Sequence, residues 1–438
     1  MDNINEYLGG RITNTRLLTP QQISQLLERG GKIFPATFKK ENRLYCRRCF
    51  SEILVSEFQT IEPYCRNCIN FGKLLVKDEI LVSSSELNFP PDQPMTWQGQ
   101  LTDQQKLVCQ EVLTSYSNQR DHLIWAVTGA GKTEIIFPLL KQIIDHGQRV
   151  ALCSPRIDVC IELFPRIQRA FANTSIGLFH GKNDQKYFPA QIMIATVHQL
   201  IRFEEAFDVL IIDEVDSFPL AGDKMLHRAI MKAKKTSGSI FYLSATPPVE
   251  LLDEVKQGQV QLSKLYRRFH GHPLPEPKCH LLLKSSYFLK VNPRIRYMIT
   301  NAIKAGERLM IFFPRIPDML ECEAALKKFF PKVSMVSVSS KDDERIDKVQ
   351  QFRQQEAQII LTTTILERGV TFPKIKVIVI DADADEFSKT ALIQIAGRAG
   401  RDKDHPNDEV HLFYQFYSRK LHLVCQEIKS VNRQAYAK

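Results

Sequence analysis

The 438-residue sequence lacks long apolar runs, and this absence excludes one class of protein. No stretch approaches the ~18 consecutive apolar residues that a membrane-spanning helix needs. The first six residues, Met1-Asp2-Asn3-Ile4-Asn5-Glu6, also lack the basic stretch and apolar run of a secretory signal. We therefore expect a cytoplasmic protein.

Cysteine is sparse and unevenly placed, which argues against a disulfide framework. Of ten cysteines, six are scattered at irregular spacings and four form two close pairs. In a reducing compartment this distribution is typical of one metal site plus buried thiols. A thioredoxin-like redox role needs only one such pair on a helix, and neither pair here has those surroundings.

The two pairs, Cys46-Arg47-Arg48-Cys49 and Cys65-Arg66-Asn67-Cys68, are separated by fifteen residues. Four thiolates at this spacing can close a tetrahedral Zn²⁺ site, and no position is then left open for water. We therefore expect a structural zinc module. Its arginines, with Arg43, either meet phosphate or form a solvated basic face.

Charge and length set the broad class. Lysine and arginine outnumber aspartate and glutamate by 59 to 49, a formal charge of +10, which favours a polyanionic partner such as nucleic acid. The length is enough for two or three domains, and 44% hydrophobic residues supply their cores.

The stretch Ala126-Val127-Thr128-Gly129-Ala130-Gly131-Lys132-Thr133 is a candidate phosphate loop between an apolar strand, 122–127, and a helix, 134–146. Its glycines let backbone N–H groups turn inward, Lys132 can reach β/γ-phosphate oxygens, and the Thr133 hydroxyl can bind Mg²⁺. Ala126 stands where the strict pattern has glycine. Pro138 falls inside the expected helix and predicts a kink.

A second candidate site follows the apolar run 208–212, which ends in Asp213-Glu214-Val215-Asp216. A buried strand that stops in three carboxylates is explained if Asp213 holds Mg²⁺ and Glu214 activates the attacking water. A later strand, 239–243, ends at Ser244-Ala245-Thr246. We expect these hydroxyl groups to link the magnesium site to a neighbouring domain.

The second half alternates strands and helices without a phosphate loop of its own. Its candidate contribution is Gln394-Ile395-Ala396-Gly397-Arg398-Ala399-Gly400-Arg401. Two arginines three apart on one helical face, Arg398 and Arg401, can both reach a γ-phosphate, while Gln394 positions the water.

Ends of parallel strands supply the candidate nucleic-acid contacts, because ligands of α/β proteins bind at the carboxyl edge of the sheet. The residues expected there are Pro155, Arg156 and Thr196 in the first half and Arg315, Thr363 and Thr364 in the second. Near the first helix of the core, Gln105 can pair with N6 and N7 of adenine. Trp97 either stacks on a base or belongs to the core.

The fold class that follows is α/β, with two tandem parallel-sheet domains after a small four-cysteine module. We expect an N-terminal segment at 1–42, the zinc module at 43–72, a linker at 73–94 and two RecA-like domains at 95–268 and 269–438. The linker ends in the stiff stretch Pro90-Pro91-Asp92-Gln93-Pro94.

Taken together, 101–105, 126–133, 213–216, 244–246 and 394–401 resemble the superfamily 2 helicase core, in that family's order. The four-cysteine module before the core, Asp-Glu-Val-Asp at 213–216, and Arg267-Arg268-Phe269-His270-Gly271-His272-Pro273-Leu274-Pro275 resemble the competence protein ComFA family. The resemblance covers the cysteine module and about residues 95–425.

The resemblance implies an ATP-dependent translocase that brings single-stranded DNA into the cytoplasm during natural competence. It also implies ATP, Mg²⁺ and Zn²⁺ as cofactors, with zinc at Cys46, Cys49, Cys65 and Cys68. Implied partners are single-stranded DNA, a ComFC-like companion protein and the uptake channel at the inner face of the cell membrane.

Two alternatives stay open at this point. A replication-restart helicase like PriA also combines zinc cysteines with a Gly-Arg-x-Gly-Arg stretch, although its cysteines lie within the core. A zinc-containing nucleic-acid-binding assembly protein with a vestigial ATP site would bind nucleotide without turnover. An RNA-directed DEAD-box helicase fits less well, because Gln394-Ile395-Ala396 replaces the His-Arg opening of that family.

Overall fold

The computed structural model describes residues 4–55, 62–90, 95–181, 186–282, 293–369, 372–402 and 408–436. Two compact units divide the chain: the first comprises 1–125 and 132–264, and the second comprises 126–131 and 265–438. The division after Lys264 lies close to the expected boundary at 268. No helix among the described residues is long and apolar enough to cross a membrane.

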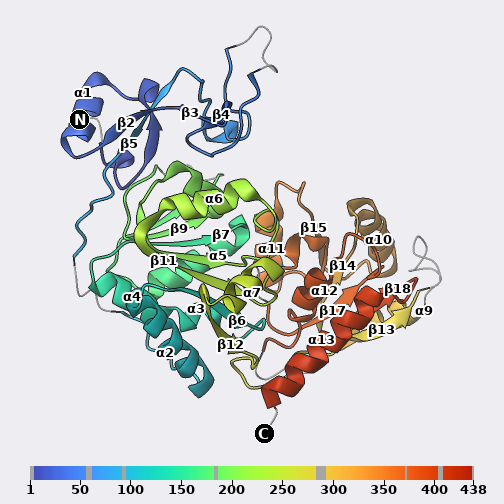
Figure 1. Cartoon of the computed structure of the whole chain (residues 1–438). Helices are drawn as coiled ribbons and strands as arrows, with labels where there is room; N and C mark the ends of the chain where they lie inside the picture. Colours follow the sequence, from blue (N-terminus) through green and yellow to red (C-terminus); the bar gives the residue numbers. More distant parts are fainter. Residues whose placement is uncertain are drawn as a thin grey trace. The chain divides into compact units, whose positions relative to one another are not determined.

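The first unit begins with an N-terminal module of short elements, drawn in blue in Figure 1. Strands β1, β5 and β2 form an antiparallel sheet, and β3 pairs with β4 in a hairpin that leads into Cys46. The elements are η1 (Ile4–Tyr7), β1 (Ile12–Asn14), η2 (Thr15–Leu17), α1 (Pro20–Glu28), β2 (Lys32–Pro35), β3 (Thr37–Lys40), β4 (Arg43–Cys46), η4 (Ile69–Phe71) and β5 (Glu79–Val82).

This sheet changes the interpretation of two segments. Strand β5 lies within 73–94, which the sequence suggests is a linker, and it pairs with strands from the segment 1–42. The first part of the expected linker is therefore part of the N-terminal module. Most of the stiff stretch expected at its end, 91–94, lies outside the described residues.

The rest of the first unit is a seven-stranded sheet in the order β12-β6-β11-β10-β7-β9-β8. Its pairings are parallel from β6 to β8, as expected for strands joined by crossover helices. Its elements are α2 (Asp103–Ser117), β6 (Asp121–Ala126), α3 (Lys132–Ile135), α4 (Phe137–Asp145), β7 (Val150–Ser154), α5 (Ile157–Ala170), β8 (Ile176–Phe179), β9 (Ile192–Thr196), η5 (Val197–Arg202), β10 (Phe207–Asp213), α6 (Lys224–Ala233), β11 (Lys234–Ser244), α7 (Val249–Lys256) and β12 (Val260–Leu265).

The second unit contains a six-stranded parallel sheet in the order β13-β18-β17-β14-β16-β15. Its elements are β13 (Lys278–Leu281), α9 (Pro293–Lys304), β14 (Arg308–Phe312), α10 (Ile316–Phe329), β15 (Met335–Val338), α11 (Arg345–Arg353), β16 (Ile359–Thr362), η6 (Thr364–Leu366), β17 (Ile375–Val379), α12 (Lys389–Ala396), β18 (Val410–Tyr414) and α13 (Arg419–Tyr436). The two parallel-sheet units confirm the predicted fold class.

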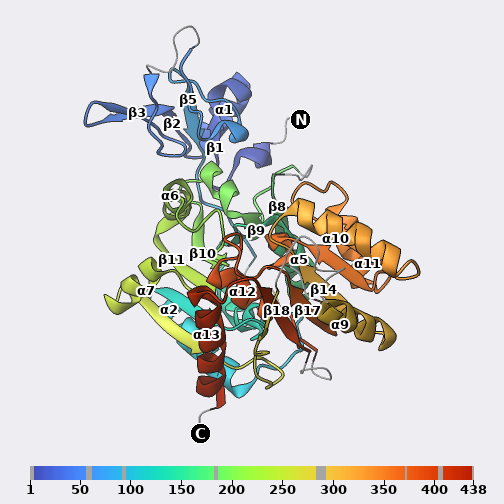
Figure 2. The same cartoon turned by 90° about the vertical axis from the view of Figure 1, so that its right-hand side faces the viewer.

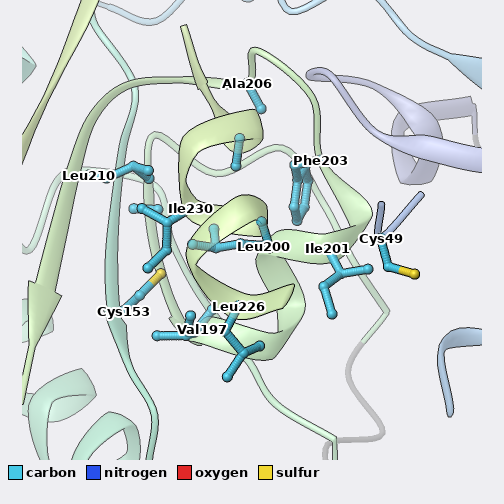
Figure 3. Close-up of a cluster of buried hydrophobic side chains, with 14 of the residues drawn as sticks. Cys49, Cys153, Val197, Leu200, Ile201, Phe203, Ala206, Leu210, Leu226 and Ile230 are labelled. Carbon is cyan, nitrogen blue, oxygen red and sulfur yellow. The ribbon is translucent and has the colours of Figure 1, made fainter. Parts of the chain in front are cut away.

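One buried cluster joins the N-terminal module to the first parallel sheet. Side chains of η5, α6 and strands β7 and β10 form its centre, and Cys49 of the module belongs to it (Figure 3). Figures 1 and 2 both show the blue module beside α6. The Arg228 guanidinium on α6 also donates to the Phe50 carbonyl oxygen at 2.9 Å. The module therefore shares a core with the first unit.

Candidate functional site

The candidate phosphate loop has the geometry that anion binding requires. It follows β6 and leads into α3, whose first residue is Lys132. Gly129 and Gly131 have positive φ angles of 78° and 77°, a backbone conformation that side-chain-bearing residues rarely adopt. The predicted strand–loop–helix arrangement is thus present, and it directs backbone N–H groups and a helix N-terminus to one place.

Pro138 is accommodated by a break in the helix. The expected single helix over 134–146 is two helices, α3 and α4, with Ile136 between them. Pro138 lies in the first turn of α4, where the missing N–H has no intrahelical acceptor to lose. The predicted disruption at Pro138 is present, but it is the start of a new helix, α4, and not a kink within one helix.

The acidic residues lie at the end of the central strand β10. Asp213 is its last residue, and its Oδ1 accepts a hydrogen bond from the Glu214 backbone N–H at 2.9 Å. Burial, together with the negative charges of Asp213 and Glu214, raises the pKa of the nearby Cys160 thiol to about 12. Cys160 therefore stays a neutral thiol beside the carboxylates.

Asp216 ties the acidic turn to the next strand. Its Oδ1 accepts from the Ser244 hydroxyl at 2.6 Å and its Oδ2 accepts from the Thr246 hydroxyl at 2.7 Å. The two hydroxyl residues named from sequence thus hold the carboxylate turn. These two hydrogen bonds connect that turn to the end of β11.

The glycine-arginine stretch of the second unit departs from the expected geometry. Helix α12 ends at Ala396, so the prediction that one helical face carries Arg398 and Arg401 is wrong. Gly397 is the C-cap of α12, and both arginines lie in the irregular segment after the helix, where Gly400 has a positive φ of 60°. Arg398 is 4% exposed, and its Nε and one terminal nitrogen donate to the Glu367 carbonyl oxygen at 2.9 and 2.7 Å.

The end of α12 lies against the phosphate loop within the second unit. A Cβ built on Gly397 would lie 1.8 Å from the Thr128 hydroxyl oxygen, so only glycine allows this approach. Gln394 lies in α12 and is 5% exposed. The C-terminal end of α12, which carries Gln394 and is capped by Gly397, therefore contacts Thr128 of the phosphate loop.

Sequence reasoning missed Arg268, which also lies against the phosphate loop. The side chain is buried, and one terminal nitrogen donates to the Ala399 carbonyl oxygen at 3.0 Å. Among the described residues its Nε and other terminal nitrogen have no hydrogen-bond partner. A Cβ on Gly129 would lie 3.0 Å from the Arg268 Nε. In the sequence, the available signal is the Arg-Arg pair at 267–268.

The predicted strand contacts lie at carboxyl edges of both sheets. In the first unit Ser154 pairs with Thr196, which places Pro155 and Arg156 beside Thr196. In the second unit Phe312 at the end of β14 pairs with Thr362 at the end of β16. The segment with Arg315 follows β14, and Thr363 and Thr364 follow β16, so both segments begin at the same edge of the sheet. The Arg315 Nε already contacts Asp318 Oδ2 at 2.8 Å.

Gln105 and Trp97 are both engaged within the protein. Thr102 caps α2, and the Gln105 amide oxygen accepts from the Thr102 backbone N–H at 2.9 Å. A two-point contact of this amide with adenine would require that cap bond to open. Trp97 packs edge-on against Phe137 with ring centroids 5.2 Å apart, which favours the core role.

The four cysteines of the module converge as predicted. Cys46, Cys49, Cys65 and Cys68 are buried, and their Sγ atoms all lie within 4.8 Å of one another. The Sγ separations are 3.8 Å for Cys46 and Cys68 and 3.5 Å for Cys49 and Cys65. Zn–S bonds of about 2.3 Å in a tetrahedron place sulfurs about 3.8 Å apart, so the donor set fits Zn²⁺.

The buried side chain of Arg48 donates hydrogen bonds to this cysteine cluster. It is 7% exposed, and its Nε and one terminal nitrogen donate to the Cys68 Sγ at 3.3 and 3.1 Å. N–H groups directed at a sulfur stabilise its thiolate form and fix its orientation. Arg48 is thus not part of a solvated face. Arg47 stacks on Phe34 at 4.5 Å, and Arg43 lies 3.5 Å from Glu52.

Comparisons with known proteins identify the family of this chain. Residues 98–249 match a family model described as type III restriction enzyme, res subunit, and residues 292–403 match the helicase conserved C-terminal domain. The chain is 37% identical over 434 residues to competence protein ComFA of Streptococcus pneumoniae, covering 98% of both chains. It is also 37% identical to ComFA of Bacillus subtilis, over 85% of this chain and 81% of that protein.

Solved structures show the same fold at low identity. Mss116p bound to single-stranded RNA and AMP-PNP superposes with a TM-score of 0.61 at 15% identity, covering 77% of both chains. Mycobacterium smegmatis Lhr bound to single-stranded DNA and AMP-PNP gives 0.57 at 16% identity, over 77% of this chain and 50% of that one. The chain is a DNA-dependent ATPase and a member of the competence protein ComFA family within helicase superfamily 2.

Proposed function

We propose that the protein is an ATP-driven single-stranded DNA translocase that moves DNA into the cytoplasm during natural competence. Its family membership makes it a competence-related helicase-like motor, and its two helicase domains imply ATP, Mg²⁺ and DNA as ligands. The observation that carries the finer proposal is the presence of strand-edge residues suited to a nucleic-acid backbone in both units.

The proposed hydrolysis uses residues from both units. Residues 128–131 hold phosphate oxygens with their backbone N–H groups, and Lys132 neutralises the β/γ-phosphates. Asp213 and Thr133 hold Mg²⁺, which spreads the charge on the phosphates, and Glu214 accepts a proton from the attacking water. Arg398 and Arg401 supply positive charge to the γ-phosphate, and Gln394 orients the water.

In this proposal the two units hold a single strand in turn. Pro155, Arg156 and Thr196 contact the backbone on the first unit, and Arg315, Thr363 and Thr364 contact it on the second. ATP binding favours approach of the units and hydrolysis favours their separation, so alternating grips move the strand. Asp216, through Ser244 and Thr246, links the acidic turn to the neighbouring strand end.

The family also supports three further proposals. The cysteine module holds one zinc ion, a ComFC-like protein accompanies the motor, and the motor works at the inner face of the membrane beside the uptake channel. The buried cysteine cluster supports the first of these. Membership of the ComFA family supports the other two.

An ATPase titration with different nucleic acids tests the proposed function. We expect single-stranded DNA to stimulate phosphate release by at least tenfold, with duplex DNA and RNA giving weaker stimulation, because an unpaired backbone fits the two strand edges. An unchanged rate across the titration with single-stranded DNA would refute the translocase. Efficient unwinding of a forked duplex would instead favour a restart helicase like PriA.

We also propose that Arg268 adds a cation to the nucleotide site. The side chain is buried against the phosphate loop with two donors that no described residue accepts. Burial lowers its pKa to about 10, but the guanidinium stays charged at neutral pH. A buried cation with free donors beside a phosphate loop matches the charge and geometry of a nucleotide phosphate.

Replacing this cation should weaken nucleotide binding selectively. We expect Arg268→Met to raise the KM for ATP by about tenfold, the loss typical of one charge-assisted hydrogen bond. Arg267→Met is the matched control, since Arg267 stacks on Tyr436 at 4.8 Å and donates to the Ala435 carbonyl oxygen. Steady-state kinetics measure both variants, with thermal melting to confirm folding. Equal KM values for the two would contradict the proposal.

A further inference from the structure

A cavity of about 730 Å³ lies within the first unit, between the N-terminal module and the carboxyl edge of the parallel sheet. Its volume falls in the range of about 300–1,000 Å³ that is typical of ligand pockets. It contains Pro155 and Thr196, two of the residues predicted to contact a strand. The opposite wall comes from the segments around Arg11 and Phe71.

Close packing fixes the N-terminal wall of the cavity. Gly9 and Gly10 have φ angles of 76° and 73°, and a Cβ on Gly10 would lie 2.5 Å from the Glu204 carbonyl oxygen. The buried Arg149 guanidinium donates to the Gly9 carbonyl oxygen at 2.8 Å. The backbone of Gly10 accepts from the Glu204 N–H at 2.9 Å. Arg11, the next residue, is thereby held at the cavity.

Basic groups outnumber acidic ones around the cavity. Arg11, Lys186 and Arg202 line it, and Glu6 is its one acidic lining residue among those described. The Glu6 carboxylate contacts Lys186 Nζ at 3.2 Å, and Arg11 donates to the Glu6 carbonyl oxygen, so the single acidic group offsets only part of the positive charge that lines the cavity. Arg202 Nε donates to the neutral Gln199 amide oxygen at 3.1 Å.

The guanidinium groups of Arg11 and Arg202 lie close enough for their positive charges to repel each other. Burial, together with the positive charges of Arg11 and Arg48, lowers the pKa of Arg202 to about 10. Arg202 follows the buried Ile201 and precedes the buried Phe203, both in the cluster drawn in Figure 3. Its backbone position is therefore fixed, and an anion in the cavity would relieve the repulsion.

Aromatic rings lie beside these cations. The Arg202 guanidinium is 5.2 Å from the Phe71 ring centroid, and the Arg11 guanidinium is 4.5 Å from the Tyr187 ring centroid. Phe71 is the last residue of η4, which begins directly after Cys68, and it is only partly buried. Paired cations and aromatic faces are the composition of sites that hold the backbone and bases of single strands.

We propose that this cavity binds one or two nucleotides of the single strand, with Arg202 and Arg11 at the phosphates and Phe71 against a base. The cysteine module then forms one wall of the strand path and extends it beyond Pro155 and Thr196. This inference rests on the proposed function and names a binding site for its substrate. Positive charge favours the polyanion over an uncharged peptide.

The first test compares Arg202→Ala with Arg120→Ala. Arg120 is an exposed residue before the amino end of β6, at the opposite edge of the sheet, so its removal changes net charge equally. We expect Arg202→Ala to weaken binding of a labelled oligothymidylate about tenfold and to reduce the salt slope of log K by about 0.7, the value for one phosphate contact on a single strand. Arg202→Lys should restore the salt slope.

The second test addresses stacking. We expect Phe71→Ala to weaken oligothymidylate binding about tenfold through lost base stacking, with an unchanged salt slope because no charge is removed. In the unaltered protein, a strand carrying 5-iodouracil should photocrosslink to Phe71 or Tyr187, as mapped by mass spectrometry. This measurement does not depend on any variant folding.

The outcomes separate this proposal from the proposed function. If single-stranded DNA stimulates the unaltered ATPase but Arg202→Ala and Phe71→Ala bind like Arg120→Ala, the cavity proposal fails and the translocase stands. Crosslinks found only outside the cavity would overturn it in the same way. If single-stranded DNA neither binds nor stimulates the unaltered protein, both proposals fail.

Discussion

Lys132→Ala should reduce the turnover of ATP at least a hundredfold, the loss typical of removing one preorganised charge from a transition state. Lys132 begins α3 directly after the two glycines with positive φ, so it follows the loop that we propose to hold the phosphates. The other cations proposed for the site, Arg268, Arg398 and Arg401, all lie in the second unit, so none of them replaces Lys132 at the start of α3. Phosphate release at saturating ATP and single-stranded DNA measures the effect.

The matched control is Lys141→Ala, which removes the same group from the next helix, α4. Lys141 pairs with Asp145 one turn away, a partly exposed contact that contributes little to stability. We expect its turnover to stay within twofold of the unaltered protein. If Lys132→Ala retained more than a tenth of the activity with normal melting, the loop would not be the hydrolytic site.

Cys46→Ser combined with Cys49→Ser should release the metal and unfold the N-terminal module. Two of four ligands are lost, and structural zinc contributes on the order of 10–16 kcal/mol to the folding of zinc-finger peptides. Because the cysteines share a buried cluster with η5 and α6, we also expect a lower melting temperature of the first unit. Metal analysis, limited proteolysis and thermal melting measure these effects.

Cys279→Ser is the control for this variant. Cys279 lies in β13 of the second unit, with its Sγ 3.7 Å from Cys425, and does not belong to the four-cysteine cluster. Its substitution should leave zinc content unchanged. A double variant that kept its metal would refute the zinc assignment, whereas loss of metal with unchanged DNA affinity would assign the module to stability alone.

Local patterns predicted much of this fold. Buried apolar runs gave β6, β7, β9 and β10, because a strand covered on both faces reads as continuous hydrophobic sequence. The cysteine pairs gave the metal cluster because ligand spacing is itself local. The ends of these strands then indicated where Asp213, Thr196 and the phosphate loop would lie.

The parts that sequence did not predict depend on contacts between distant segments. The sheet β1-β5-β2 joins strands almost seventy residues apart, and β5 by itself resembles a linker segment. Arg268 is a candidate site residue because it is buried beside the phosphate loop, and Arg202 because it lines the cavity. Neither position can be predicted from the local sequence. The spacing of Arg398 and Arg401 would continue a helical pattern, but α12 ends at Ala396 with Gly397 as its C-cap, so this spacing does not predict the end of the helix.

The buried cluster that contains both Cys49 and the side chains of η5 has a mechanical consequence. A module attached only by a tether would swing under load, and part of each stroke would stretch the tether instead of moving the strand. A module that shares a core is stiff, because tight packing resists deformation. In the proposed motor, the module and the first parallel sheet therefore move as one rigid body, and a pull on a strand bound at the module reaches β10 through packed side chains.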